Sequence, residues 1–245
     1  MQGRQYRSPN EYGSSFVASI IIETLKQTIN RTPVNLLAIS QTARTTSDIA
    51  NEVLTNLTGL QNPSGAILGP SCRFKLALDA VQLGAFLQVA RVLTWQEFEE
   101  FSEECLRRAG FETQRGQTFS DSTRRWQIDI TAVKNHILLA VDCKHWKSPN
   151  YASKFNKAVE HQKESLAPLI RYMRQTKDLD DQEVYALPVI LTLYEPRGSL
   201  LNGAVIVSVT QLPEFLERLT PYDSELPFVT VRKALSVNHQ PRQSE

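Results

Sequence analysis

Apolar residues follow two different spacings along the chain, and the change between them divides the sequence near residue 92. Before this point they recur every three or four residues, which predicts short helices at 13–29, 34–43, 45–57 and 73–92. After it, the segments follow the order helix, three strands, helix, two strands, helix. The predicted fold class is therefore α/β, with a mixed sheet flanked by helices and preceded by a small helical domain.

The predicted domains are residues 1–92 and 93–237, followed by a disordered tail at 238–245. In the first domain a tight turn at Thr42–Arg44 joins two short helices, as in a helix-turn-helix or winged-helix module. Arg44 and Thr46 would then lead a recognition helix and contact DNA. Many small helical domains share this pattern, so a helical scaffold or a dimerisation domain is the alternative.

The pattern is clearest between Trp126 and Lys147, where two apolar runs flank a polar turn and predict a β-hairpin. A shorter strand at 111–116 precedes the hairpin and is followed by a polar loop at 117–125. On the first hairpin strand, alternation places Asp129 on one face. The other face is predicted to hold four apolar residues: Trp126, Ile128, Ile130 and Ala132.

Asp142 and Lys144 share a face at the end of the second hairpin strand. A same-face salt bridge is the simpler explanation for this pair. However, the run at 137–141 is apolar on both faces and predicts an interior strand, where an unpaired charge would cost several kcal/mol. Because Asp129 lies on the neighbouring strand, we favour a site in which carboxylates bind a metal ion beside a cation.

Composition narrows the class of protein. With 41% hydrophobic and 22% charged residues among 245, the chain resembles an ordinary soluble globular protein with a sizeable core. No apolar run is long enough to span a bilayer, and residues 1–13 lack the apolar core of a signal peptide, so we expect a cytoplasmic location without membrane contact. The three widely spaced cysteines predict neither disulfides nor a zinc site, and without a Walker-type loop no ATP site is expected.

The net charge of +1 conceals an uneven distribution. Residues 105–177 contain fourteen Lys and Arg against six Asp and Glu, a net charge of +8, which leaves −7 for the rest of the chain. Solvated helix faces must account for some of these cations. Together with the acids, the basic segment indicates a surface for a polyanion, and nucleic acid is the expected partner.

The spacing of Asp129, Asp142, Cys143 and Lys144 resembles the D…(D/E)xK signature of the PD-(D/E)xK nuclease superfamily, and the flanking sequence resembles its Mrr-like restriction-endonuclease branch. The proline of the name is absent, because Ile128 precedes Asp129. This resemblance covers 93–210 and implies a Mg²⁺-dependent endonuclease acting on DNA, with Mn²⁺ as a substitute. Asp129, Asp142 and the carbonyl of Cys143 would bind the metal, while Lys144 orients or activates the attacking water.

Two helices add site candidates. On the helix that starts at Thr94, Glu99 lies on the rim of the apolar stripe, and Glu103 is the reserve candidate. The resemblance of this helix to the opening helix of Mrr-like domains implies that Glu99 is the acid near the metal, bound directly or through water. On the helix after Lys144, Gln162 occupies a core-facing position, where it either supports the catalytic site or bonds to a neighbouring backbone group.

Basic and aromatic residues near the acids are candidate nucleic-acid contacts, although surface arginines often have no such role. They are Arg124, Arg125, Trp146, Lys147 and Lys154, in addition to Arg44 and Thr46. A second hypothesis keeps the nuclease fold without cleavage, as a DNA-binding or assembly protein, but the presence of both acids with the lysine argues for cleavage. The sequence does not decide between DNA and RNA, between one and two metal ions, or between a monomer and a homodimer.

Overall fold

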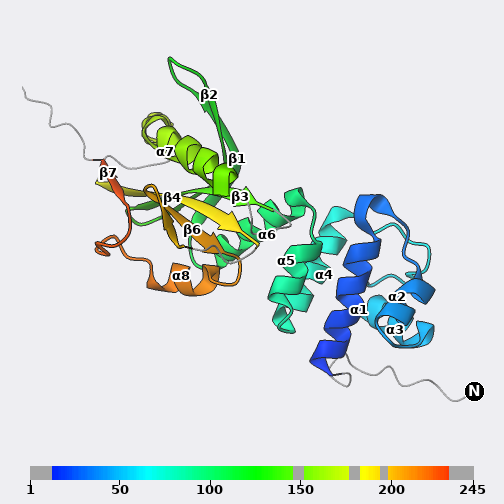
Figure 1. Cartoon of the computed structure of the whole chain (residues 1–245). Coiled ribbons are helices and arrows are strands. Elements are labelled where there is room, and N and C mark those ends of the chain that lie inside the picture. The colour runs from blue at the N-terminus through cyan, green and yellow to red at the C-terminus, as the bar shows by residue number, and fades with distance from the viewer. Residues whose placement is uncertain (1–12, 146–151, 177–182, 194–197, 232–245) are drawn as a thin grey trace, which may run out of the picture.

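The computed structural model of the chain describes residues 13–145, 152–176, 183–193 and 198–231, and shows a helical N-terminal region followed by a mixed α/β region (Figure 1). The first region contains α1 (Ser14–Gln27), a 3₁₀ turn (Ile29–Arg31), α2 (Leu36–Thr42), α3 (Ser47–Thr58), α4 (Pro70–Gln82) and α5 (Phe86–Val92). The second contains α6 (Trp95–Arg108), β1 (Glu112–Ser120), β2 (Arg125–Lys134), β3 (Ile137–Lys144), α7 (Ala152–Gln175), β4 (Val184–Thr192), β5 (Leu200–Leu201), β6 (Ala204–Ser208), α8 (Leu212–Arg218) and β7 (Val229–Val231). The predicted fold class is confirmed.

Polar caps and a glycine determine where the N-terminal helices begin and end. The side chain of Asn35 accepts a hydrogen bond from the main-chain N–H of Ala38 and starts α2, and Thr46 starts α3 in the same way. The single helix predicted over 73–92 is wrong. Two helices, α4 and α5, are separated at Gly84, whose φ of 87° lies in the left-handed region that ends helices.

The strands form one mixed sheet in the order β1-β2-β3-β4-β6-β5, and β7 pairs with the start of β4. The first three strands are antiparallel neighbours, whereas β3, β4 and β6 run parallel. The central strands are buried on both faces, which explains why β3 and β4 are apolar almost throughout. β1 extends beyond the predicted strand at 111–116, because residues assigned to a loop pair with β2, with Phe119 opposite Trp126.

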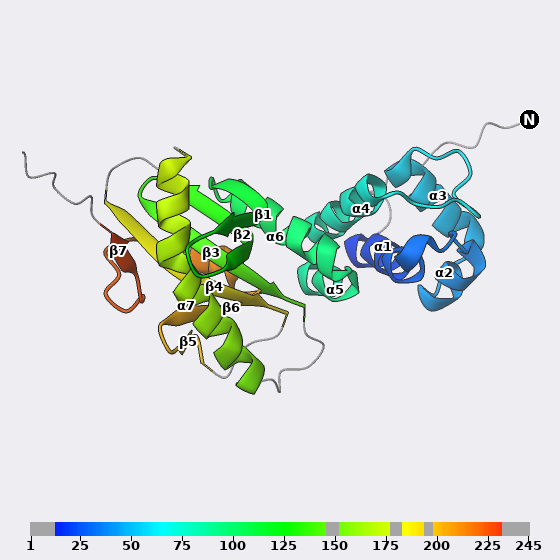
Figure 2. The same ribbon diagram turned by 90° about the horizontal axis from the view of Figure 1, so that it is seen from above.

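Helices cover both faces of the sheet (Figures 1 and 2). On one face, Phe98 and Phe101 of α6 and Leu212 of α8 belong to the same buried cluster as Leu139 and other strand residues. On the opposite face, the apolar stripe of α7 packs on two smaller clusters that include Leu138 and Ile190. The alternation of Leu138 and Leu139 between the two clusters is the period of two that makes β3 an interior strand. No helix in the described part of the chain is both long enough and apolar enough to cross a membrane.

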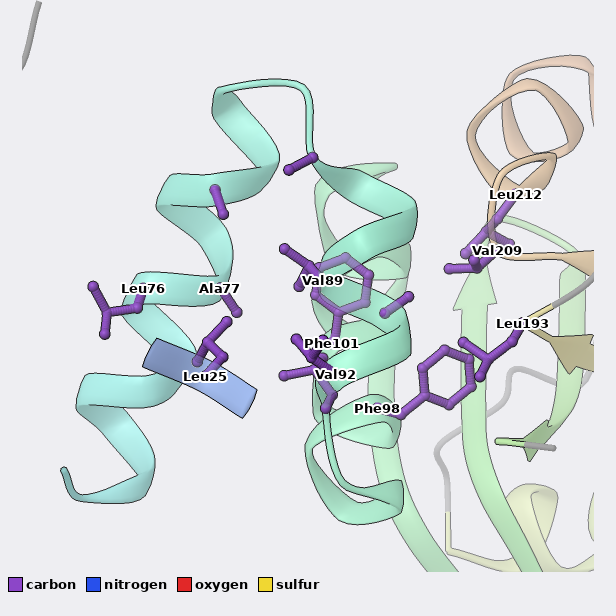
Figure 3. Packing of buried hydrophobic residues seen from close by; sticks show 14 of the residues in the cluster. Leu25, Leu76, Ala77, Val89, Val92, Phe98, Phe101, Leu193, Val209 and Leu212 are labelled. Carbon is purple, nitrogen blue, oxygen red and sulfur yellow. The ribbon is translucent and has the colours of Figure 1, made fainter. Parts of the chain in front are cut away.

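One hydrophobic core joins the helical region to the sheet. Leu25 and Leu76 pack toward Val89 and Phe101, and the same buried cluster continues to Leu193 beside the sheet (Figure 3). The predicted boundary at residue 92 lies between α5 and α6, so this cluster crosses it.

An ion pair between a buried arginine and a half-buried glutamate crosses the same boundary. The guanidinium of Arg73 on α4 bonds both carboxylate oxygens of Glu97 on α6, at 2.6 and 3.1 Å, and donates to the carbonyl of Leu25 at 2.8 Å. Glu97 also accepts from the main-chain N–H of Thr94, completing the capping box that starts α6. The helical region is therefore fixed against α6 by charge as well as by apolar contacts.

Candidate active site

At Asp129, the apolar side chains of β2 change the face of the sheet on which they pack. Trp126 and Ile128 belong to the cluster beneath α7, whereas Ile130 and Ala132 belong to the cluster beneath α6. The shared face predicted for these four residues is therefore wrong. The change of face coincides with Gly116 on β1, which lies between the strand pairs on either side of Asp129 and has a φ of 65°. Only glycine adopts this conformation readily, so Gly116 explains the twist.

Asp129 also marks the point where the hairpin leaves the rest of the sheet. The last pair between β2 and β3 is Ile130 with Val141. Beyond it, the carboxylate of Asp129 accepts a hydrogen bond of 2.8 Å from the main-chain N–H of Cys143. The separation of the two strands places Asp129 beside the end of β3, which carries Asp142 and Lys144.

These residues line an open cleft of about 550 Å³ between the strand ends and α7. The lining residues are Gln127, Asp129, Asp142, Lys144, Lys157, Ala158 and His161. Lys144 Nζ donates to Asp142 Oδ1 at 2.7 Å, and both side chains are largely buried. The structure therefore brings together the two acids and the lysine predicted to share a site.

Burial and neighbouring negative charges raise the pKa values of two acids at this site. Burial and the charge of Asp142 raise the pKa of Asp129 to about 6, against the opposing effects of the Cys143 N–H and Lys144. Burial and the charge of Asp129 raise the pKa of Glu99 to about 7, although Arg115 and Lys144 oppose this. Glu99 thus lies within electrostatic reach of the cleft from α6. The reserve acid, Glu103, is instead paired with Arg107 at 3.1 Å.

The donor set suits a hard divalent cation. Within the described residues, no group of three or more His, Cys, Asp or Glu side chains is arranged to hold an ion. Mg²⁺ often takes one or two carboxylates and completes its coordination with water, so Asp129 and Asp142 fit it, and a cation between them would relieve their repulsion. Cys143 adds only its carbonyl oxygen, because its thiol packs toward the α6 cluster, where burial raises the pKa of the thiol well above its usual value.

Gln162 is buried beside the cleft without lining it. Its Nε2 donates to the carbonyl of Ala140 at 3.3 Å, and Ser165 donates to the Gln162 main-chain carbonyl at 2.8 Å. Of the two roles considered for this amide, the geometry shows the hydrogen bond to backbone. Any effect of Gln162 on the site would act through the position of β3.

The candidate nucleic-acid contacts on the hairpin differ in their surroundings. Arg124 stacks on the Trp126 indole at 3.6 Å from the ring centroid and forms a 2.6 Å ion pair with Glu164 of α7, so it fastens the hairpin to this helix. Arg125 is exposed at the start of β2. Trp146 and Lys147 lie outside the described residues, as does the side chain of Lys154.

Arg44 and Thr46 are not brought to the cleft. They lie between α2 and α3, at the end of the molecule farthest from the sheet in both views (Figures 1 and 2). The Thr46 hydroxyl caps α3, and Arg44 is exposed with a φ of 55°. The helix–turn–helix order predicted from the sequence is present, but residues 13–92 contain no strand that could form a wing.

Three cleft residues were missed by the sequence reasoning: Gln127, Lys157 and His161. Lys157 and His161 are one helical turn apart and flank an apolar stripe, which is a pattern shared by most surface helices. Only the contact of α7 with the strand ends distinguishes Lys157 and His161 from ordinary surface residues of a helix.

His145, which follows Lys144, has a structural contact instead. Its Nε2 lies 3.1 Å from the carbonyl oxygen of Ala90 in α5, and its ring packs against Phe98 at 5.3 Å between centroids. The end of β3 is thereby attached to the helical region.

Part of the α/β region matches a known protein family. Residues 90–176 match the family model Mrr_cat, described as restriction endonuclease. An uncharacterized protein from Archaeoglobus fulgidus is 28% identical over 138 residues, which are 56% of this chain and 100% of that protein.

Two crystal structures are also similar. The protein of unknown function AF1548 has a TM-score of 0.25 and 16% identity, over 38% of this chain and 44% of that one. The protein VC1899 from Vibrio cholerae has a TM-score of 0.36 and 8% identity, over 87% of this chain and 56% of that one. The chain thus spans about half of each solved protein, and neither likeness bears on activity.

The family match contains Glu99, Asp129, Asp142 and Lys144, the same residues that the fold gathers around the cleft. Residues 90–176 therefore match the Mrr-type restriction-endonuclease family, which belongs to the PD-(D/E)xK superfamily.

Proposed function

We propose that this protein is a Mg²⁺-dependent endonuclease that hydrolyses phosphodiester bonds in DNA, with Mn²⁺ as a working substitute. The observation that carries the proposal is the cleft in which Asp129, Asp142 and Lys144 meet, inside a domain of a nuclease family. The raised pKa of Asp129 adds support, because carboxylates that repel each other in a partly buried site favour binding of a cation.

The side chains take different roles in this proposal. Asp129, Asp142 and the Cys143 carbonyl would hold the metal, with Glu99 near it or bound to it through water. When bound, Mg²⁺ would neutralise charge that develops on the scissile phosphate. Lys144, held by Asp142 at 2.7 Å, points its ammonium at the cleft and orients or deprotonates the attacking water.

The remaining assignments extend from the cleft to the surface. Arg125 and the basic residues near α7, including Lys154, would contact the DNA backbone, with Trp146 and Lys147 nearby in sequence. Arg44 and Thr46 would contact DNA only if it also reached the helical region. A cytoplasmic location and assembly as a homodimer stay predictions.

Cleavage of supercoiled plasmid tests the proposal directly. The full chain should nick or linearise plasmid with Mg²⁺ or Mn²⁺ and lose this activity in EDTA, and a panel of duplex, junction, flap and single-stranded DNA would define the substrate. Asp142→Asn is the matched control for contaminating nucleases. Equal cleavage by the two proteins, or binding of every substrate without cleavage, would instead favour a DNA-binding or assembly protein.

A further inference from the structure

The α7 side of the cleft carries two polar groups that the site described so far does not use. Lys157 and His161 lie one helical turn apart, and both line the cleft together with Asp129, Asp142 and Lys144. Within the described part of the chain, the Lys157 ammonium forms no ion pair and neither ring nitrogen of His161 has a hydrogen-bond partner. Both groups are thus free to bind something that enters the cleft.

The imidazole of His161 is held in place by the hairpin. Its ring packs on the Trp126 indole, with centroids 5.6 Å apart, and the same indole carries the Arg124 guanidinium. Arg124 is tied in turn to Glu164, which follows His161 on α7. The ring is therefore confined to a small range of orientations before any ligand arrives, which reduces the entropy lost on binding.

Burial and two nearby cations favour the neutral form of the His161 imidazole. Burial, Arg124 and Lys144 lower the pKa of His161, while Asp129 and Glu164 oppose them. A neutral imidazole presents one N–H donor and one acceptor, in contrast to the full charge of Lys157. The two groups would therefore contribute to binding in different ways.

A nucleic acid that reaches the acids must bring phosphates into a cleft lined by two carboxylates. Lys144 is already bonded to Asp142, so Lys157 and His161 are the donors on the α7 side of the cleft that have no protein partner among the described residues. We propose that Lys157 and His161 together bind one backbone phosphate of the DNA strand being cut, next to the scissile phosphate. This inference rests on the proposed nuclease function. Lys157 supplies attraction, and His161 supplies a directed hydrogen bond that fixes the strand against the acids.

Paired variants test the two contributions. Lys157→Ala should weaken DNA binding and reduce the slope of log affinity against log salt by about 1, because one phosphate contact is lost. His161→Ala should leave that slope unchanged but slow single-turnover cleavage by about 10- to 100-fold, the range for one hydrogen bond to a charged group. His161→Gln keeps an N–H donor and should recover part of the rate.

Lys163→Ala is the matched control, since Lys163 is an exposed lysine of the same helix whose side chain lies over Gly203. If Lys157→Ala and Lys163→Ala have the same salt slope and His161→Ala cleaves at the normal rate, the inference is wrong. If the wild-type protein still cleaves DNA and Asp142→Asn abolishes this cleavage, the proposed function stands even though the inference fails. The salt slopes measured in EDTA decide the Lys157 contact even for a protein that does not cleave. If His161→Ala has a lowered melting temperature because Trp126 loses packing, the cleavage rate of His161→Gln tests the role of the histidine instead.

Discussion

At the scale of single residues, the main feature is a pair of acids kept from ionising at their usual pH. The pKa of Glu99 is raised to about 7 and that of Asp129 to about 6, because both are partly buried, because the charge of Asp129 acts on Glu99, and because the charge of Asp142 acts on Asp129. The folded protein without metal therefore binds more protons than the unfolded chain between roughly pH 4 and 7. Stability from these groups is present below this window and is lost as pH rises through the folded pKa values.

We accordingly expect the melting temperature in EDTA to fall by several degrees between pH 5 and pH 8. Glu99→Gln removes one of the two charges and should melt higher than wild type at pH 8, with little difference at pH 5. Thermal unfolding followed by circular dichroism would measure both proteins. Parallel pH profiles would show that Glu99 ionises normally.

The two aspartates should be replaceable without loss of the fold. Asn at position 129 can still accept from the Cys143 N–H, and Asn at 142 keeps the shape of the side chain. We expect Asp129→Asn and Asp142→Asn to reduce cleavage by orders of magnitude and to weaken Mn²⁺ binding in calorimetry. Unchanged cleavage by either purified variant would remove that residue from the mechanism.

Lys144 allows chemistry to be separated from binding. One lysine among many basic residues contributes little to the overall attraction for phosphates. Lys144→Ala should therefore reduce the cleavage rate of bound DNA far more than it reduces the affinity for DNA. Lys144→Arg keeps the charge but cannot give up a proton. Cleavage by the arginine variant would assign Lys144 the role of a fixed cation, whereas loss of affinity with a normal rate would make it a simple phosphate contact.

At the scale of elements, periodicity predicted α6, β3 and α7, because each has one regular apolar pattern. It failed on the β1–β2 hairpin, where Gln117, Thr118 and Ser120 look like a loop and where the strands change face at Asp129. Alternation along β2 does not reveal this twist, because the twist depends on the left-handed conformation of Gly116 in the partner strand. Asp129, Asp142 and Lys144 could be predicted as neighbours because a short motif relates them, and Glu99 because its helix resembles a known one, whereas Lys157 and His161 depend on tertiary contact.

The twist itself can be tested with Gly116→Ala. An added Cβ would meet no atom within 4 Å, so its cost is the strain of a positive φ, about 1–2 kcal/mol. Gly65→Ala, in the loop between α3 and α4, has a similar φ of 74° and equally open surroundings. Both should lower stability to urea by similar amounts, but only Gly116→Ala should slow cleavage, because it misplaces Asp129. Equal activity of the two would mean that the site tolerates the change.

At the scale of the whole molecule, the helical and α/β regions share one core and are linked by the ion pair of Arg73 with Glu97. Removing the Arg73 side chain leaves Glu97 without its partner, which costs at most about 3–5 kcal/mol, the range for a fully buried pair. We therefore expect Arg73→Ala to shift urea unfolding strongly while the chain still unfolds in a single transition. A loss below about 1 kcal/mol would mean that water screens the pair as on a surface.

The contact of His145 with Ala90 gives the shared core a dynamic consequence. Lys144 is one residue away from a side chain held by α5, so a displacement of α5 would pull on the end of β3. Weakening this link with His145→Ala should slow cleavage of bound DNA without changing its affinity, and an unaltered rate would show that β3 holds its own position. Binding of a partner to the helical region could then change the position of Lys144 through α5 and His145.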